Sequence, residues 1–160
     1  MIEVPITKEM LTVAKQKAKE IGKLNNSIRK GLGNLAGVLG ELCFIQHYPN
    51  ALLNNTYDYD VLLNNSKIEI KTKVRTVKPK LFYECSVAKF NTKQKADYYY
   101  FVSLYVVDNE YVSGFLLGGL PKDEYFLQAK ELKQGELDSS NNYIVKADCW
   151  NLPIKNLRVL

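Results

Sequence analysis

The chain has 160 residues, a hydrophobic share of 46% and a formal net charge of +5. This composition is typical of one globular domain, long enough to bury about two thirds of its unfolded surface. No apolar run approaches the roughly 20 residues that a membrane span needs, so no membrane partner is expected. The first ten residues lack the charged-then-apolar pattern of a secretory signal, which predicts an intracellular, cytoplasmic protein.

Cysteine and histidine counts exclude several kinds of site. Cys43, Cys85 and Cys149 are too few for a four-cysteine zinc or iron–sulfur site, and they lie too far apart to suggest a disulfide framework. We expect them to be free, buried thiols. His47 is the only histidine, which excludes multi-histidine metal sites. Its place just before Pro49, at the end of a helical segment, favours a role at the helix terminus.

The first part of the chain reads as helical. Thr7 can cap a helix that Gly22 ends, and a second helix is predicted over residues 28–47. That helix contains four glycines, and an interior glycine costs roughly 1 kcal/mol relative to alanine. We interpret Gly37, one turn before Glu41, as a point where the helix approaches a sheet and presents the carboxylate to it. In the alternative, the glycines shorten the helix and Glu41 is an ordinary exposed acid.

A hairpin is predicted over residues 57–75. Apolar residues alternate on both sides of Asn64-Asn65, a pair that tolerates the positive φ angles of a tight turn. They are Tyr57, Tyr59, Val61 and Leu63 before the turn, and Ile68, Ile70 and Val74 after it. With a two-residue turn, Leu63 pairs with Ser66 and Asp60 faces Glu69.

The polar face of this hairpin places two acids opposite each other. Like charges paired across strands destabilise a hairpin, so Asp60 and Glu69 require a cation between them or a proton on one of them. A divalent ion is the simplest answer, and Lys71 on the same face completes a set suited to phosphodiester hydrolysis. A four-residue turn would instead pair Asp60 with Lys71, and a three-residue loop would separate the two acids. Asp58 points to the same face as Asp60 and is therefore a rival for its role as a metal ligand, or else a salt-bridge partner of Lys71, which it would face.

Three strands are predicted in the middle of the chain. Residues 81–87 form a candidate strand, and residues 98–107 read as a central strand buried on both faces. We expect the tyrosines of this strand to lie in the core of the sheet rather than to stack on bases. Asp108-Asn109 is a turn, after which residues 111–117 return as another strand.

The C-terminal part is expected to leave the sheet. Gly118-Gly119 is predicted to break it, and Pro121 to begin a helix that ends near Lys130. Residues 143–147 are a candidate last strand and residues 153–160 a short terminal helix. Trp150 is assigned either to the core or to a dimer interface.

Basic residues are concentrated in the part of the sequence around and after Glu69. Between Lys67 and Lys95 the only acids are Glu69 and Glu84, whereas the basic residues are Lys67, Lys71, Lys73, Arg75, Lys78, Lys80, Lys89, Lys93 and Lys95. Such a stretch suits a phosphate backbone. A solvated, lysine-rich surface is the alternative.

Helix, hairpin and strands in this order resemble the PD-(D/E)XK, or restriction-endonuclease-like, nuclease superfamily from about residue 28 to residue 117. The matching residues are Glu41 on the helix, Asp60 on the first strand, and Glu69 and Lys71 of the Glu-x-Lys motif on the next. Tyr59 stands where the family name has proline. The resemblance implies an α/β fold in one domain over residues 1–160, with a central mixed β-sheet of four or five strands flanked by helices.

The resemblance also implies a metal-dependent DNA endonuclease that hydrolyses phosphodiester bonds. Mg²⁺, for which Mn²⁺ can substitute, would be held by Asp60, Glu69 and the carbonyl of Ile70, with Glu41 binding through water or holding a second ion. Lys71 would orient or deprotonate the attacking water. The DNA backbone would be held by Lys73, Arg75, Lys78, Lys80, Lys89 and Lys93.

Two alternatives remain open at this point. The first is a non-cleaving nucleic-acid-binding protein of the same fold, and the second is a plain hairpin on which Asp60 and Glu69 are solvated. Among nucleases, the small chain fits a Holliday-junction-resolvase-like or other structure-specific enzyme. Junction resolution needs two coordinated cuts and therefore a homodimer, for which Trp150 or the C-terminal segment could supply the interface.

Overall fold

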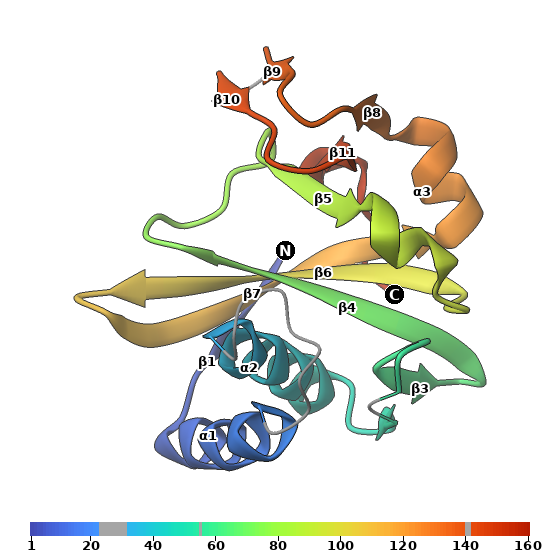
Figure 1. Ribbon diagram of the computed structural model, residues 1–160. Helices are drawn as coiled ribbons and strands as arrows, with labels where there is room; N and C mark the ends of the chain where they lie inside the picture. Colours follow the sequence, from blue (N-terminus) through green and yellow to red (C-terminus); the bar gives the residue numbers. More distant parts are fainter. Residues whose placement is uncertain (23–31, 55, 140–141) are drawn as a thin grey trace.

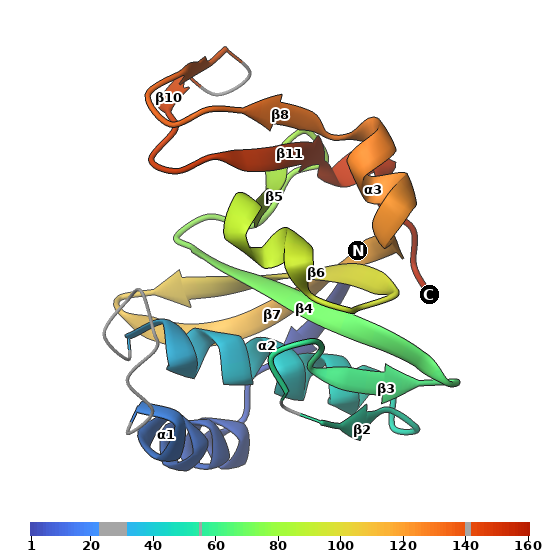
Figure 2. The same cartoon turned by 45° about the vertical axis from the view of Figure 1, so that its right-hand side comes forward.

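A computed structural model describes residues 1–22, 32–54, 56–139 and 142–160, which form a mixed α/β fold in three layers (Figure 1). Helices α1 (Lys8–Gly22) and α2 (Leu32–His47) cover one face of a six-stranded mixed sheet. A three-stranded sheet and helix α3 (Lys122–Gln128) cover the other face (Figure 2). None of the helices in these ranges is long and apolar enough to cross a membrane.

The large sheet has the strand order β1-β7-β6-β4-β3-β2. Its strands are β1 (Ile2–Pro5), β2 (Leu52–Leu53), β3 (Val61–Leu63), β4 (Ser66–Arg75), β6 (Tyr98–Val107) and β7 (Glu110–Pro121). Strands β4 and β6 run parallel and all other neighbours run antiparallel. The predicted mixed sheet flanked by helices is therefore present, but with six strands rather than four or five.

The small sheet was not predicted. It has the order β5-β11-β8, formed by β5 (Glu84–Ala88), β11 (Cys149–Pro153) and β8 (Lys130–Leu132). A short hairpin of β9 (Leu137–Asp138) and β10 (Tyr143–Ile144) precedes β11, and the 3-10 turns η1 (Lys89–Lys93) and η2 (Ile154–Asn156) complete the described elements. The expected strand over residues 81–87 thus begins later, at Glu84, and pairs outside the main sheet.

Each face of the large sheet has its own hydrophobic core. Tyr100 and Val102 of β6 pack with α1 and α2, whereas Tyr99 and Phe101 of the same strand pack with the small sheet and α3. This alternation confirms the prediction of a strand buried on both faces, with the tyrosines in the core. Trp150 is half-buried in the second core and packs against Phe126, with ring centroids 5.3 Å apart.

The first helix and the cysteines agree with expectation. Thr7 accepts a hydrogen bond at Oγ1 from the backbone N–H of Met10 at 3.2 Å, which is the predicted cap of α1. Helix α2 ends at His47 as predicted, and its described part begins at Leu32, so the predicted start at residue 28 lies outside the described residues. The three cysteines are free thiols, although Cys149 is only half-buried.

The hairpin register is the one predicted for a two-residue turn. Val61 pairs with Ile68, and Leu63 pairs with Ser66. Asn64 and Asn65 have φ angles of 48° and 66°, the left-handed values that a tight hairpin turn requires.

The first strand of the hairpin is shorter than predicted, because it begins only at Val61 and leaves Tyr57 68% exposed. The Thr56 hydroxyl donates to the carbonyl of Tyr59 at 3.1 Å, and the same Oγ1 accepts from the Tyr59 N–H at 3.3 Å. Such a local side-chain turn competes with a strand ladder.

Gly118-Gly119 does not break the sheet, contrary to expectation. Strand β7 continues to Pro121 through an irregularity at which Gly118 pairs with Phe101 and Leu116 pairs with Val102. Gly118 has a φ of 116°, a conformation that glycine adopts readily, so the glycine permits the bulge.

The ends of the C-terminal elements also differ from the prediction. The helix after Pro121 ends at Gln128 because β8 begins at Lys130. The expected strand over residues 143–147 is limited to β10, and the main strand of this region is β11. In place of a terminal helix, the chain extends after η2. There Arg158 exchanges two backbone hydrogen bonds with Gly119, of 2.7 and 3.1 Å. The N–H and C=O groups of Arg158 are thus paired with the sheet rather than within a helix.

Candidate active site

Asp60 is held at the edge of β4, where the ladder between β3 and β4 ends. Its backbone N–H donates to the carbonyl of Ile68 at 3.0 Å, and its carboxylate Oδ2 accepts from the backbone N–H of Ile70 at 2.7 Å. The carboxylate thus takes the place of the next carbonyl of the ladder. Asp58 instead accepts from the backbone N–H of Lys95 at 3.2 Å, so the expectation that it faces Lys71 is wrong.

Glu69 and Lys71 lie on the face of β4 that looks toward the small sheet, beside Tyr99 and Phe101 of β6. Glu69 is only 6% exposed, and its Oε1 accepts from Lys71 Nζ at 2.7 Å. This burial excludes the alternative in which Glu69 is solvated on a plain hairpin. The lysine ammonium is therefore fixed beside the acid pair by a partly buried ion pair.

Gln94 is a site residue that the sequence did not reveal. It follows η1, is buried, and donates from Nε2 to Glu69 Oε1 at 2.9 Å and to the carbonyl of Tyr57 at 2.8 Å. Its Oε1 accepts from Lys71 Nζ at 3.0 Å. A single glutamine in a polar connection has no local pattern that marks it as buried, so only the fold identifies it.

Glu41 reaches the site because α2 approaches β4 closely. A Cβ at Gly40 would overlap the hydroxyl oxygen of Thr72, whereas a Cβ at Gly37 would meet nothing within 4 Å. The prediction that a glycine lets the helix approach the sheet is confirmed, but the glycine responsible is Gly40, adjacent to Glu41. The alternative of an ordinary exposed Glu41 is wrong, since its Oε2 is buried.

The pKa values of Glu41 and Asp60 are raised at this site. Burial raises the pKa of Glu41 to about 7, while the charge of Lys17 opposes this rise and the smaller effect of the Glu69 charge adds to it. The pKa of Asp60 is also raised well above its ordinary value, first by burial and then by the charges of Glu69 and Glu41. The N–H of Ile70 and the charge of Lys71 oppose this rise. The site is therefore short of positive charge despite Lys71.

Two buried carboxylate oxygens without a hydrogen-bond partner indicate that these residues suit a metal. Glu41 Oε2 and Glu69 Oε2 are both buried without a hydrogen-bond partner, which is costly unless a proton or a cation satisfies them. Carboxylate oxygens are the donors that Mg²⁺ prefers. Among the described residues, no three His, Cys, Asp or Glu side chains form a metal-ligand group as they stand. The donors therefore suit a hard divalent cation, and the carboxylates must draw together to hold one.

The predicted DNA-binding residues divide into two sets. Lys73 and Arg75 follow Lys71 along β4 and line a cavity between this strand and the small sheet. The guanidinium of Arg75 donates to the carbonyl of Glu84 at 3.0 Å and lies 4.9 Å from the ring centroid of Tyr83.

The other predicted basic residues lie outside this cavity. Lys78 is 3.3 Å from Glu3, Lys80 lies 5.8 Å from the ring centroid of Phe82, and Lys89 is 3.5 Å from Asp148. Lys93 is exposed on η1. Lys146, which the sequence did not single out, lines the cavity from the segment before β11.

No protein-family model matches the chain, and no curated protein matches it either. The function of the protein is therefore inferred from the geometry around Glu41, Asp60, Glu69 and Lys71.

Proposed function

We propose that this protein is a metal-dependent DNA endonuclease of the restriction-endonuclease-like type. The observation that carries the proposal is the convergence of Glu41, Asp60 and Glu69 from α2, the hairpin and β4, with Lys71 Nζ held 2.7 Å from Glu69. The order of helix, hairpin and the parallel pair β4–β6 supports the same fold type.

The proposed metal ligands are the carboxylates and one carbonyl. Asp60 and Glu69, with the main-chain carbonyl of Ile70, would hold Mg²⁺ or Mn²⁺, and Glu41 would bind it through water or hold a second ion. A bound ion would lower the pKa of the water bound to it and would polarise the scissile phosphate. The orphaned oxygens of Glu41 and Glu69 are the atoms that gain most from such an ion.

Lys71 is assigned the role next to the reacting phosphate. Its ammonium would orient the attacking water and offset the negative charge that develops on phosphorus, whereas only its neutral amine form could deprotonate that water. Glu69 and Gln94 restrict its position, because Nζ donates to both side chains. A lysine held by two partners loses less freedom on binding substrate than a solvated one, which favours the reactive geometry.

The basic residues hold the substrate by charge rather than by sequence. Lys73 and Arg75 continue along β4 from Lys71 and would neutralise successive phosphates. Lys78, Lys80, Lys89 and Lys93 lie outside the cavity and would contact only a longer DNA.

We further propose that the substrate is structure-specific, such as a junction or another branched DNA. Two coordinated cuts at a junction would need a homodimer. Because Trp150 packs against Phe126 within its own chain, the C-terminal segment is the better candidate for that contact. Light scattering with and without branched DNA tests for the dimer.

The test is a cleavage assay with Mg²⁺ or Mn²⁺ on duplex, single-stranded and branched DNA. We expect Lys71→Ala and Asp60→Asn each to lower the rate by roughly 100-fold or more, since each removes charge stabilisation at the reacting phosphate. Lys15→Ala on the exposed face of α1 and Asp58→Asn are matched controls that should retain activity. Cleavage that survives both site substitutions would overturn the mechanism.

A second candidate is a protein of the same fold that binds nucleic acid without cutting it. It is favoured by one observation: Lys71, Lys73, Arg75 and Lys146 line a cavity beside the site, which suits a phosphate backbone whether or not the chain is cut. Salt-dependent DNA binding, with no cleavage of any of the three DNA forms, would select this candidate.

A further inference from the structure

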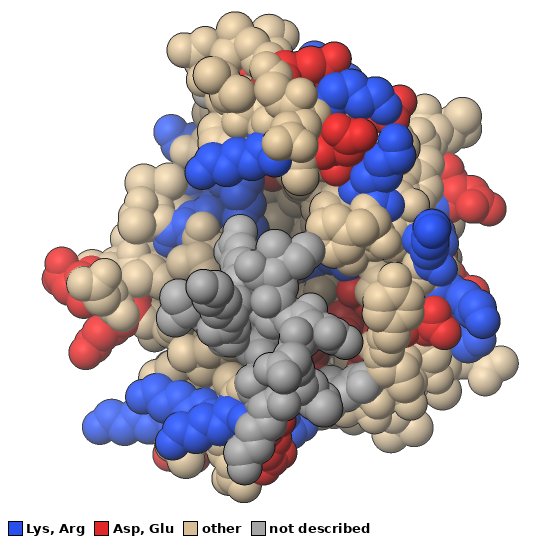
Figure 3. Space-filling view, in the orientation of Figure 1, with Lys and Arg blue, Asp and Glu red and all other residues tan. Residues whose placement is uncertain are grey.

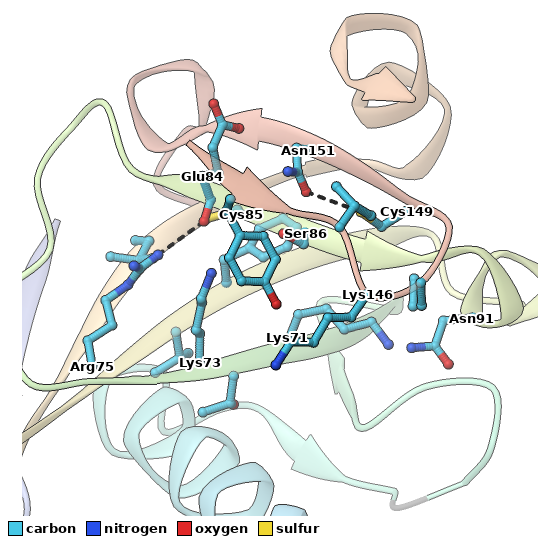
Figure 4. A pocket seen from close by; sticks show the side chains of 18 residues that line it. Lys71, Lys73, Arg75, Glu84, Cys85, Ser86, Asn91, Lys146, Cys149 and Asn151 are labelled. Carbon is cyan, nitrogen blue, oxygen red and sulfur yellow. Dashed lines mark hydrogen bonds between the residues drawn. The ribbon is translucent and has the colours of Figure 1, made fainter. Parts of the chain in front are cut away.

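A cavity of about 630 Å³ lies between β4 and the small sheet, next to the candidate active site (Figure 4). One wall is β4, which contributes Lys71, Lys73 and Arg75. The opposite wall comes from β5 and from the segment between β10 and β11, which contributes Lys146. Pockets of roughly 300–1,000 Å³ hold drug-sized ligands, so this one has room for about one or two nucleotides.

The charge of the cavity is strongly positive. Of the described residues that line it, four are cations, Lys71, Lys73, Arg75 and Lys146, and one is an acid, Glu84. On the face drawn in Figure 3, Lys and Arg side chains border the hollow between the two sheets. Lys73 is open to solvent, yet partial desolvation lowers its pKa, and the charge of Arg75 lowers it further. An anion between these cations would relieve both effects.

The spacing of the cations suits a polynucleotide backbone. Lys71, Lys73 and Arg75 occupy alternate positions of β4, and a rise of roughly 3.3 Å per residue places neighbours about 6.6 Å apart on one face. Successive phosphates of an extended strand can therefore meet successive cations. Tyr143 also lines the cavity and adds an aromatic ring to the wall, of the kind on which bases stack.

The cavity is too small to enclose a double helix. Its volume of about 630 Å³ has room for about one or two nucleotides, which is less than a stretch of paired DNA occupies. The space between β4 and the small sheet therefore admits one strand whose bases are unpaired.

Lys71 joins this cavity to the acids. Its side chain lines the cavity while its Nζ is hydrogen-bonded to Glu69 and Gln94. A strand that runs along Lys73 and Arg75 consequently reaches Glu69 and Asp60 with its next phosphate.

We infer that this cavity binds a single unpaired DNA strand, such as a single-stranded tail or flap, and delivers its phosphate to Lys71. Cleavage of the bound strand rests on the proposed nuclease function. Which form of DNA binds, and where it binds, is a separate claim. Duplex DNA without an unpaired segment is then a poor substrate.

Binding without metal tests the claim apart from catalysis. Fluorescence anisotropy in EDTA should show a labelled oligothymidylate binding at least about tenfold tighter than a blunt duplex of similar length. The double variant Lys73→Gln/Lys146→Gln should reduce the salt slope for single strands by about 1.4, or about 0.7 for each lost phosphate contact. The matched variant Lys15→Gln/Lys19→Gln, on exposed α1 positions, should leave it unchanged. Equal affinity for duplex, or equal effects of the two double variants, would overturn the inference. A single-stranded RNA of the same length tests whether the sugar matters.

Cys149 provides a reporter in the wild-type chain. It is half-buried and lines the cavity, whereas Cys43 and Cys85 are buried. Saturating oligothymidylate should abolish its labelling by a maleimide at mildly alkaline pH, and labelling that persists would place the strand elsewhere. Protection without cleavage of any substrate would support the cavity and reject the nuclease. Cleavage of blunt duplex without protection would do the reverse.

Discussion

Glu69 and Gln94 form a buried hydrogen-bonded pair at the centre of the site, with Gln94 Nε2 donating to Glu69 Oε1 at 2.9 Å. Because the same amide accepts from Lys71 Nζ, Gln94 links the acid and the lysine of the Glu-x-Lys motif from a segment 25 residues away from Glu69. Gln94 is therefore a positioning residue for Lys71.

Replacing Gln94 should affect turnover more than binding. We expect Gln94→Ala to lower kcat by roughly 10- to 100-fold, as is usual for groups that orient catalytic ligands, with little change in the Kd for DNA. Steady-state kinetics beside anisotropy measures both. Gln128→Ala, an exposed glutamine on α3, is the control. If kcat stays at the wild-type level in a folded Gln94→Ala protein, the glutamine does not position Lys71.

Asp60→Asn should separate metal binding from folding. An asparagine oxygen can still accept the hydrogen bond from the Ile70 N–H, but the charge that we propose holds a cation is lost. Calorimetric titration with Mn²⁺ or Ca²⁺ should therefore show binding to wild type and none to Asp60→Asn or Glu69→Ala, while thermal stability without metal is retained in Asp60→Asn. Asp58→Asn should bind metal normally. Equal binding by all four proteins would exclude the proposed ligands.

The free energy of unfolding should depend on pH because the buried acids of the site have raised pKa values. The pKa of Glu41 is about 7 in the folded protein against an ordinary 4.5, so the folded state binds more protons between these values. The free energy of unfolding, measured by denaturant titration in EDTA, should therefore fall as pH rises from about 4.5 to about 7, by roughly 1–3 kcal/mol.

Substitution of Glu41 tests this assignment. Glu41→Gln should make the fall shallower without abolishing it, because the raised pKa of Asp60 acts in the same direction. Glu20→Gln, at an exposed position of α1, should keep the wild-type slope. A stability that rises over this pH range would contradict the assignment.

Two glycines of α2 should respond in opposite ways to alanine. Gly37→Ala meets nothing within 4 Å and should stabilise the helix by roughly 0.5–1 kcal/mol. Gly40→Ala would overlap Thr72 and should cost roughly 1–3 kcal/mol in denaturant unfolding, and it should reduce cleavage by displacing Glu41.

A second substitution checks the cause. In the Gly40→Ala background, Thr72→Ala removes the overlapping hydroxyl and leaves contacts near 3.1 Å at Thr72 Cβ, so it should recover part of the stability. Equal effects of alanine at the two glycines would show that α2 does not depend on this close approach.

Local patterns were enough to predict the hairpin that carries the site. Asn64-Asn65 and the alternation around it determine the pairing of Val61 with Ile68, because register in a tight hairpin depends on the turn and on which face is apolar. The central strand over residues 98–107 was predictable for the same reason, since its run of β-branched and aromatic residues is local. The prediction that the first hairpin strand begins at Tyr57 was wrong, because the Thr56 side chain forms a competing local turn with the backbone of Tyr59.

The amino-acid sequence by itself determined the first helix, the register of the hairpin, the central strand over residues 98–107 and the acids and lysine that come together on the hairpin, because each depends on neighbours a few residues apart. Only the tertiary structure decided that Gly40 rather than Gly37 meets the sheet, that Gln94 completes the site, and that the small sheet forms a basic cavity with β4. These contacts join segments distant in the chain. Their stability depends on burial and packing across layers, which no local pattern encodes.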